Sequence, residues 1–268
     1  MKFNKVLSTV AVCAFSAVAL SSCSKEENVQ VKDQVSDEVV TKLHDLGFNT
    51  DNVQKLDDGY LVEGDIFMSN ASLSDAEVAN RLRVGSEEQY RTTNLVSVGS
   101  GRTINVAVSS TLPSAYVTAT DEAIRRFNAE NLLIRFRRVS SGYNILLTKA
   151  PSGSTYLASA GFPSGGNPYN SVRVNSDAMG TANASTYIAT VLAHEIGHCI
   201  GFRHTDYMNR AYSCGGAYTN EGASTVGAIH IPGTPTSADP NSWMLACIGS
   251  GGNRPFNSND RTALNYLY

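Results

Sequence analysis

The chain has 268 residues, of which 42% are hydrophobic, and its formal net charge is −3. This length and composition predict one or two globular domains with a sizeable hydrophobic core. The pI of about 6.0 and the lack of a basic stripe argue against a nucleic-acid partner.

The first 22 residues have the pattern of a secretory signal peptide. Residues 1–5 are basic, and residues 6–20 form an apolar run that is too short to cross a membrane as a helix. The run leads into Leu-Ser-Ser-Cys, ending at Cys23, which resembles a bacterial lipobox. We therefore expect residues 1–22 to be removed and Cys23 to carry a lipid. The alternative is an ordinary cleaved signal in which Cys23 has no role.

Residues 23–35 are polar and charged, as in a tether. The segment Ser24-Lys25-Glu26-Glu27 resembles the signal that sends some Bacteroidetes lipoproteins to the outer face of the outer membrane. A solvated charged linker is the alternative interpretation. With either interpretation the protein leaves the cytoplasm. The location that we expect is the cell envelope, as an outer-membrane lipoprotein anchored through Cys23, and the first interpretation adds exposure on the cell surface.

Residues 36–98 predict a small N-terminal region. Residues 37–48 have apolar side chains at helical spacing, acidic residues at the start and a glycine near the end, which is typical of a short amphipathic helix. Residues 59–68 follow a turn and predict a strand, and residues 73–82 predict a second helix.

Residues 99–268 predict the main domain, which follows a Gly/Ser-rich boundary near residues 97–102. The first elements alternate as strand, helix, strand and strand, which indicates an α+β fold with a mixed sheet backed by a helix. The expected strands are 103–108, 133–139, 144–148, 156–163 and 171–175, and the expected helices are 115–130, a long helix that begins near 183–185, and 258–268.

The long helix carries the pattern H-E-x-x-H-x-x-G-x-x-H. On a helix, His194 and His198 lie one turn apart on the same face, with Glu195 beside them. A sharp turn at Gly201, which tolerates a positive φ, allows His204 to complete a set of three ligands. Three imidazoles leave the fourth position of a tetrahedral Zn²⁺ open to water, as in a catalytic site. Glu195 then acts as the general base toward that water.

This motif resembles that of the metzincin clan of zinc endopeptidases, and its HEIGH form resembles the M57 or "HEIGH" metallopeptidases. The resemblance implies an α+β, metzincin-like catalytic domain with a twisted mixed β-sheet, an antiparallel edge strand, an active-site helix and a C-terminal helix. A substrate pairs with such an edge strand by strand addition. The resemblance also implies that Met244, in Asn-Ser-Trp-Met, lies in a turn beneath the zinc, where a lone Met would otherwise be core packing.

The N-terminal region also resembles that of the family, because Val-Glu-Gly-Asp-Ile at residues 62–66 recurs there before the catalytic domain. This favours a propeptide. The alternative is a small appended domain that only packs against the catalytic domain and has no role in latency. The region has no cysteine after Cys23 to cap the zinc. If it keeps the enzyme latent, a carboxylate such as Asp65 is the more suitable fourth ligand.

Three cysteines remain after the leader and Cys23, namely Cys199, Cys214 and Cys247. We expect a disulfide between Cys214 and Cys247, because each lies in a Gly-rich loop and the compartment is oxidising. A pair between Cys199 and Cys214 is the alternative. Cys199 follows a histidine of the motif on the helix, so its default is a buried free thiol.

The sequence therefore predicts a zinc-dependent endopeptidase that hydrolyses peptide bonds of proteins, with one catalytic zinc. The alternative is a catalytically silent surface lipoprotein or adhesin on the same scaffold. A purely structural zinc site is disfavoured, because the motif lacks a fourth protein ligand. Structural calcium has no support, since no EF-type loop is present. Cleavage specificity and oligomeric state do not follow from the sequence.

Overall fold

The computed structural model describes residues 35–75, 89–222, 227–235 and 237–268. The predicted signal peptide at 1–22, Cys23 and nearly all of the predicted tether at 23–35 lie outside these residues. Within the part described, no helix is long and apolar enough to cross a membrane. Residues from Gln34 onward cluster into one unit, so the N-terminal region and the main domain are described together. The predicted boundary between residues 98 and 99 stays a prediction.

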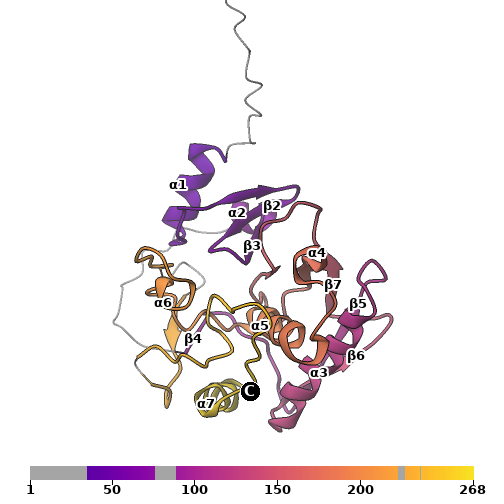
Figure 1. The fold of residues 1–268 in the computed structure, drawn as a ribbon. Helices are drawn as coiled ribbons and strands as arrows, with labels where there is room; N and C mark the ends of the chain where they lie inside the picture. The colour runs from indigo at the N-terminus through magenta and orange to yellow at the C-terminus, as the bar shows by residue number, and fades with distance from the viewer. Residues whose placement is uncertain (1–34, 76–88, 223–226, 236) are drawn as a thin grey trace, which may run out of the picture. The chain divides into compact units, whose positions relative to one another are not determined.

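A mixed sheet runs through the described residues (Figure 1) in the order β1-β2-β3-β8-β9-β7-β5-β6. The pairs β5–β6, β5–β7 and β7–β9 are parallel, and β8 is antiparallel to β9. Their bounds are β1 Gln54–Leu56, β2 Gly59–Val62, β3 Ile66–Ser69, β5 Arg102–Val108, β6 Ile134–Arg138, β7 Ile145–Lys149, β8 Ala158–Ala160 and β9 Ser171–Val174.

Two helices pack against one another to build the main core: α3 (Ala115–Ala129) and α5 (Ala189–Ile200). Apolar residues of α3 and α5 face the buried side chains of the parallel strands, and α5 is buried along its whole length. The remaining elements are α1 Asp37–Asp45, α2 Asn70–Asp75, β4 Tyr90–Arg91, α4 Ser176–Met179, the π-helix η1 Ala184–Ile188, α6 Ala211–Cys214, β10 Ile229–His230 and α7 Ser258–Leu267. The predicted α+β fold with a mixed sheet, a central helix and a C-terminal helix is confirmed.

The predicted strand at residues 59–68 is wrong in one respect, because the segment is the hairpin β2–β3. Glu63 and Gly64 take positive φ values of 55° and 90° and reverse the chain. The apolar residues on both sides hid this turn. As a result, residues 63–65 project from the end of a hairpin instead of alternating along a strand.

Strand β3 pairs in parallel with β8, with Ile66 opposite Ala160. The antiparallel strand β8, expected as an edge, therefore has a partner from the N-terminal region. The predicted helix at 73–82 corresponds in part to α2, and its residues after 75 lie outside the described part. The long helix predicted to begin near 183–185 also starts differently, because Asn183 adopts a left-handed conformation with no side-chain cap bond and a π-helix follows it.

Candidate metal centre

Helix α5 places His194 and His198 one turn apart, with their Nε2 atoms 3.0 Å from each other. The helix is apolar around almost its whole circumference, so core packing holds it in place. The Nδ1–H of His194 donates to the carbonyl of Trp243, and that of His198 to the carbonyl of Phe202, both at 2.9 Å. Because a carbonyl only accepts, both imidazoles keep a lone pair on Nε2.

Gly201 ends α5 with a φ of 114°. A Cβ at Gly201 would lie 2.7 Å from the side chain of Leu95 and 3.1 Å from the carbonyl of Asn94, so both the conformation and the space require glycine. The turn brings His204 back toward α5. Its Nδ1–H donates to the carboxylate of Glu221 at 2.9 Å, which directs Nε2 toward the other two imidazoles.

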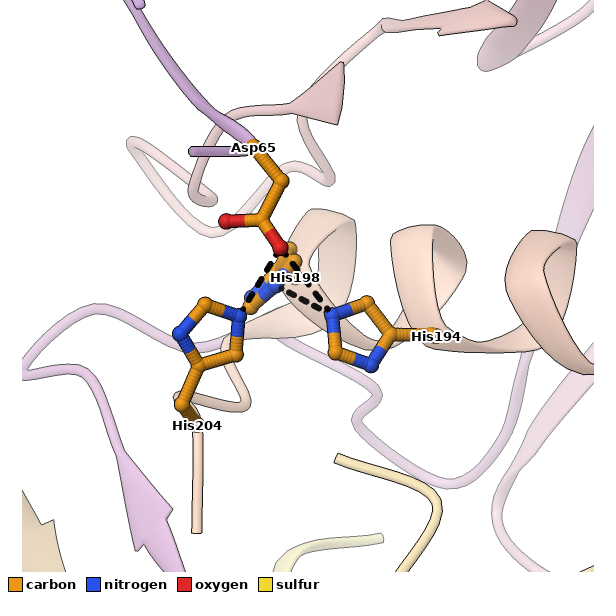
Figure 2. A group of neighbouring side chains, drawn as sticks. All are labelled: Asp65, His194, His198 and His204. Atoms are coloured by element: carbon orange, nitrogen blue, oxygen red, sulfur yellow. Dashed lines mark hydrogen bonds and ion pairs between the residues drawn. The ribbon is translucent and has the colours of Figure 1, made fainter. Parts of the chain in front are cut away.

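Asp65 completes the cluster from the tip of the β2–β3 hairpin (Figure 2). Its Oδ2 lies 3.0 Å from Nε2 of His204 and 3.6 Å from Nε2 of His194. The candidate ligand atoms of Asp65, His194, His198 and His204 all lie within 4.8 Å of one another. Among the described residues, Asp65 Oδ1 is buried without a hydrogen-bond partner.

This donor set fits a zinc ion. Ligands about 2 Å from a tetrahedral Zn²⁺ lie about 3.3 Å apart, which is close to the distances of 3.0 and 3.6 Å in the cluster. Each imidazole is oriented by a carbonyl or a carboxylate on Nδ1, as is usual for metal-bound histidines. The four groups are buried. Their lone pairs and negative charge therefore need a positively charged partner, and a bound metal cation provides one.

Glu195 lies beside the cluster and is 2% exposed. In the part of the chain that is described, its Oε2 has no hydrogen-bond partner. Burial raises the pKa of Glu195 well above its ordinary value; the charge of Asp65 raises it further and His204 opposes the shift. The carboxyl group lines the same cavity as His194 and Asp65, so it is available to a group that enters this cavity.

A network of buried charges surrounds the third imidazole. Arg203 Nη2 lies 3.0 Å from Glu63 Oε2 and 4.0 Å from Glu221 Oε2, and Arg210 Nη1 donates to Glu221 at 2.7 Å. Burial raises the pKa of Glu63 to about 8, although Arg203 lowers it. Glu63, Arg203 and Glu221 were not predicted as site residues from the sequence, because nothing in their spacing indicates that three distant segments meet.

Met244 is fully buried and lies beneath α5. A Cβ at Gly197 would come within 2.7 Å of its sulfur and 2.6 Å of the ring of Trp243. The glycine inside the HEIGH motif therefore lets this turn approach the helix. Gly197 is part of the HEIGH form of the motif, but no contact of this glycine was predicted from the sequence.

The disulfide in the structure joins Cys214 to Cys247, and Cys199 is a buried free thiol. Cys247 belongs to the chain that follows Met244, and its partner ends α6, so the bridge connects two segments near the metal cluster. His230 is in β10 and contacts Thr234. It is not a member of the four-residue cluster.

A family model, Peptidase_M57, described as "Dual-action HEIGH metallo-peptidase", matches residues 60–268. The match covers most of the chain, and the chain therefore belongs to this family. The protein is a zinc metalloendopeptidase that acts on protein or peptide substrates, and the His₃/Asp cluster fits its catalytic zinc. The predicted family, enzyme class and cofactor are confirmed.

Solved structures of zinc proteases are also similar to this chain. Myroilysin is 14% identical, with 63% of this chain and 86% of that chain covered and a TM-score of 0.39. High choriolytic enzyme 1, a hatching enzyme zinc-protease from the medaka fish Oryzias latipes, is 17% identical, with 65% and 92% covered and a TM-score of 0.36. A comparison with curated proteins found no match.

Proposed function

We propose that His194, His198 and His204 hold the catalytic zinc and that Glu195 is the general base of peptide-bond hydrolysis. The observation that carries this proposal is the carboxylate of Glu195, which has an unpartnered oxygen and lines one cavity with His194. Bound there, zinc supplies a Lewis acid that polarises the substrate carbonyl and lowers the pKa of a water molecule.

The side chains of the site then have separate tasks. Glu195 takes a proton from the attacking water and passes it to the leaving amine. The carbonyls of Trp243 and Phe202 and the carboxylate of Glu221 keep the three imidazoles in one tautomer and one orientation. Burial of the site excludes bulk water, which strengthens these electrostatic interactions.

The test compares the parent protein, without the signal peptide and after limited proteolysis of the N-terminal region, with Glu195→Gln treated in the same way. We expect about one zinc per chain in both, cleavage of denatured protein by the parent only, and a loss of at least about 100-fold in the variant because the proton acceptor is gone. Zinc is quantified by elemental analysis and cleavage by mass spectrometry. Equal cleavage by the variant would exclude Glu195 as the base. Zinc binding without cleavage by either protein, even after proteolytic removal of the N-terminal region, would favour the silent binding lipoprotein.

In the same proposal, the N-terminal region keeps the enzyme latent. Asp65 provides a fourth donor to the cluster, and four protein ligands are the arrangement of a closed zinc site. Strand β3 also occupies the pairing edge of β8, where a substrate strand would otherwise add. Both the metal and the substrate edge are therefore blocked by residues of one hairpin, and its removal would open the site.

Asp65→Ala tests latency directly. Because the variant frees one zinc position, the unprocessed chain is expected to gain activity, while the matched control Asp51→Ala, an exposed residue of the same region, leaves it unchanged. Activity is followed with a quenched fluorescent peptide. An unprocessed Asp65→Ala protein that binds zinc and gains no activity would argue for a region that only packs.

The protein is further proposed to be a lipoprotein of the cell envelope, with its anchor at Cys23. The support is the lipobox-like sequence before Cys23 and the charged segment after it. Metabolic labelling with a fatty-acid analogue should mark the parent and leave Cys23→Ala unlabelled, and surface proteolysis of intact cells tests exposure. Label on Cys23→Ala would contradict the anchor.

A further inference from the structure

A cavity of about 310 Å³ adjoins the metal cluster and continues along α5. Its apolar wall comes from Val191 on the helix and from Leu245 and Ile248 in the chain after Met244. His194 and Glu195 belong to the same lining, so a side chain that enters the cavity belongs to a residue next to the scissile bond. A water occupies about 30 Å³ of liquid volume, and the cavity therefore has room for a side chain of the size of glutamate.

The charged groups that line this cavity differ in whether they already have an oppositely charged partner. Arg210 is neutralised by Glu221, with Nη1 and Oε1 2.7 Å apart. Asp65 belongs to the N-terminal hairpin. Arg254 is different, because in the described part of the chain it forms no ion pair; its Nη1 donates only to the carbonyl of Cys247, at 2.8 Å. Once the hairpin is displaced, Arg254 is the cation of the cavity without a carboxylate partner.

Arg254 stays charged in this position. Burial lowers its pKa, and the carboxylates of Asp206 and Asp260 oppose that effect, but a guanidinium is protonated at any ordinary pH. Asp206 is itself bonded to Ser213 Oγ at 2.6 Å and to the backbone N–H of Ala246 at 2.9 Å. The remaining donors of Arg254 are thus available for a carboxylate, which a guanidinium binds in a bidentate manner.

The direction of the substrate decides which residue reaches Arg254. Leu157 and Ala158, at the start of β8, line the cavity, whereas Ala160 at its end donates its N–H to the backbone carbonyl of Asp65, whose side chain belongs to the metal cluster. A substrate strand antiparallel to β8, the more stable pairing, runs from Ala160 toward Leu157. The residue after the scissile bond then lies beside the cavity.

We propose that the enzyme selects aspartate or glutamate immediately after the scissile bond and that Arg254 binds this carboxylate. This inference rests on the proposed function and adds a substrate class to it. Arg254 is a specificity-determining residue, and it is separate from the groups that carry out the hydrolysis.

The test uses zinc-loaded Asp65→Ala protein that begins at residue 23 as the parent, because the chain with Asp65 in place is expected to be latent. The substrates are peptides that differ only by Glu or Gln directly after one cleavable bond. We expect the parent to favour Glu by about 10- to 100-fold in kcat/KM, as for a charge-assisted hydrogen bond. Arg254→Met should reduce this ratio to about 1, and Arg254→Lys should keep part of the preference.

Arg261→Met is the matched control, because Arg261 is on α7, outside the lining of the cavity, and pairs with Glu130. It should keep the full preference. Cleavage of both peptides by the parent at equal rates overturns the acidic preference and leaves the proposed function intact. Acidic residues enriched before the cut bond overturn the substrate direction. No cleavage of either peptide by this parent, even after limited proteolysis of its N-terminal region, contradicts the proposed function itself. If Arg254→Met does not fold, the Glu-to-Gln ratio of the parent and Arg254→Lys still decide.

Discussion

The two sides of the metal cluster differ in the side chains that support them, which are apolar and aromatic on one side and charged on the other. On one side, α5 lies in a core of apolar and aromatic side chains, in which Trp243 contacts Phe127, Phe202 and Phe256 through edge-on rings. On the other side, Glu221 accepts from His204, and Arg203 lies between the carboxyl groups of Glu221 and Glu63. We refer to residues 63–65 and 203–221 as the charged lip.

The apolar side of the cluster stays in place when the N-terminal hairpin leaves, whereas the charged side loses some of its contacts. Apolar packing is non-directional and fixes the two histidines of α5 through the whole core. Buried ion pairs cost much desolvation, and they stabilise only while both partners are present. Glu63 and Asp65 come from the N-terminal hairpin, so its departure changes the charged lip and leaves the core intact. Such a division suits a latent enzyme, because removal of the hairpin can open the site while the two histidines of α5 stay in position.

The largest effect is expected from the core. Trp243→Ala removes a buried ring and should lower the free energy of unfolding by about 3–5 kcal/mol, measured by urea denaturation of the zinc-loaded protein. Trp243→Phe, which keeps an aromatic ring, should lose clearly less. A loss below about 1 kcal/mol for the alanine variant would mean that the core is not what holds α5.

The disulfide Cys214–Cys247 links the charged lip to the chain that follows Met244. Replacing Cys214 and Cys247 by serine opens a link across a separation of 33 residues and should cost about 2–4 kcal/mol of stability through the unfolded chain. Thermal unfolding under oxidising and reducing conditions measures this. Cys199→Ser is the control, since Cys199 forms no bridge. A parent equally stable in reductant would contradict the prediction.

Replacement of Glu221, whose carboxylate accepts from His204, tests the role of the charged lip in zinc binding. Burial favours protonation of Glu221, yet the charges of His204, Arg210 and Arg203 lower its pKa, so it is an anion that accepts from His204. Glu221→Gln should weaken zinc binding about 10- to 100-fold, measured by competition with a chromogenic chelator. Stability without zinc should change less. Unaltered zinc affinity would show that the orientation of His204 comes from elsewhere.

The smallest effect is expected for charges on the outer side of the core. Hydrogen bonds from Arg125 and, after it, Arg126 lower the pKa of Glu122 from 4.5 to about 2. Because the folded pKa lies below the unfolded one, the stabilisation is present above about pH 4.5 and is lost as the pH falls toward 2. Glu122→Gln should cost about 1 kcal/mol at pH 7 and nothing near pH 2. Glu38→Gln, exposed on α1, should show no such difference at either pH.

The sequence by itself determined the chemistry of this protein. The spacing of His194, Glu195, His198, Gly201 and His204 is local, and the geometry of one helix and one turn converts it into three converging ligands. Apolar periodicity and turn residues likewise determined most of the strands and helices, because these signals act over a few residues.

Only the tertiary structure decided what surrounds those ligands. Asp65 lies 139 residues before His204 in the chain. Glu63 comes from the same hairpin as Asp65, and Glu221 and Arg254 reach the site from two further segments. Their approach depends on strand pairing, on the β2–β3 turn and on packing that leaves close contact at Gly197. No local pattern encodes such encounters, because their energy comes from groups that are neighbours only after the chain has folded.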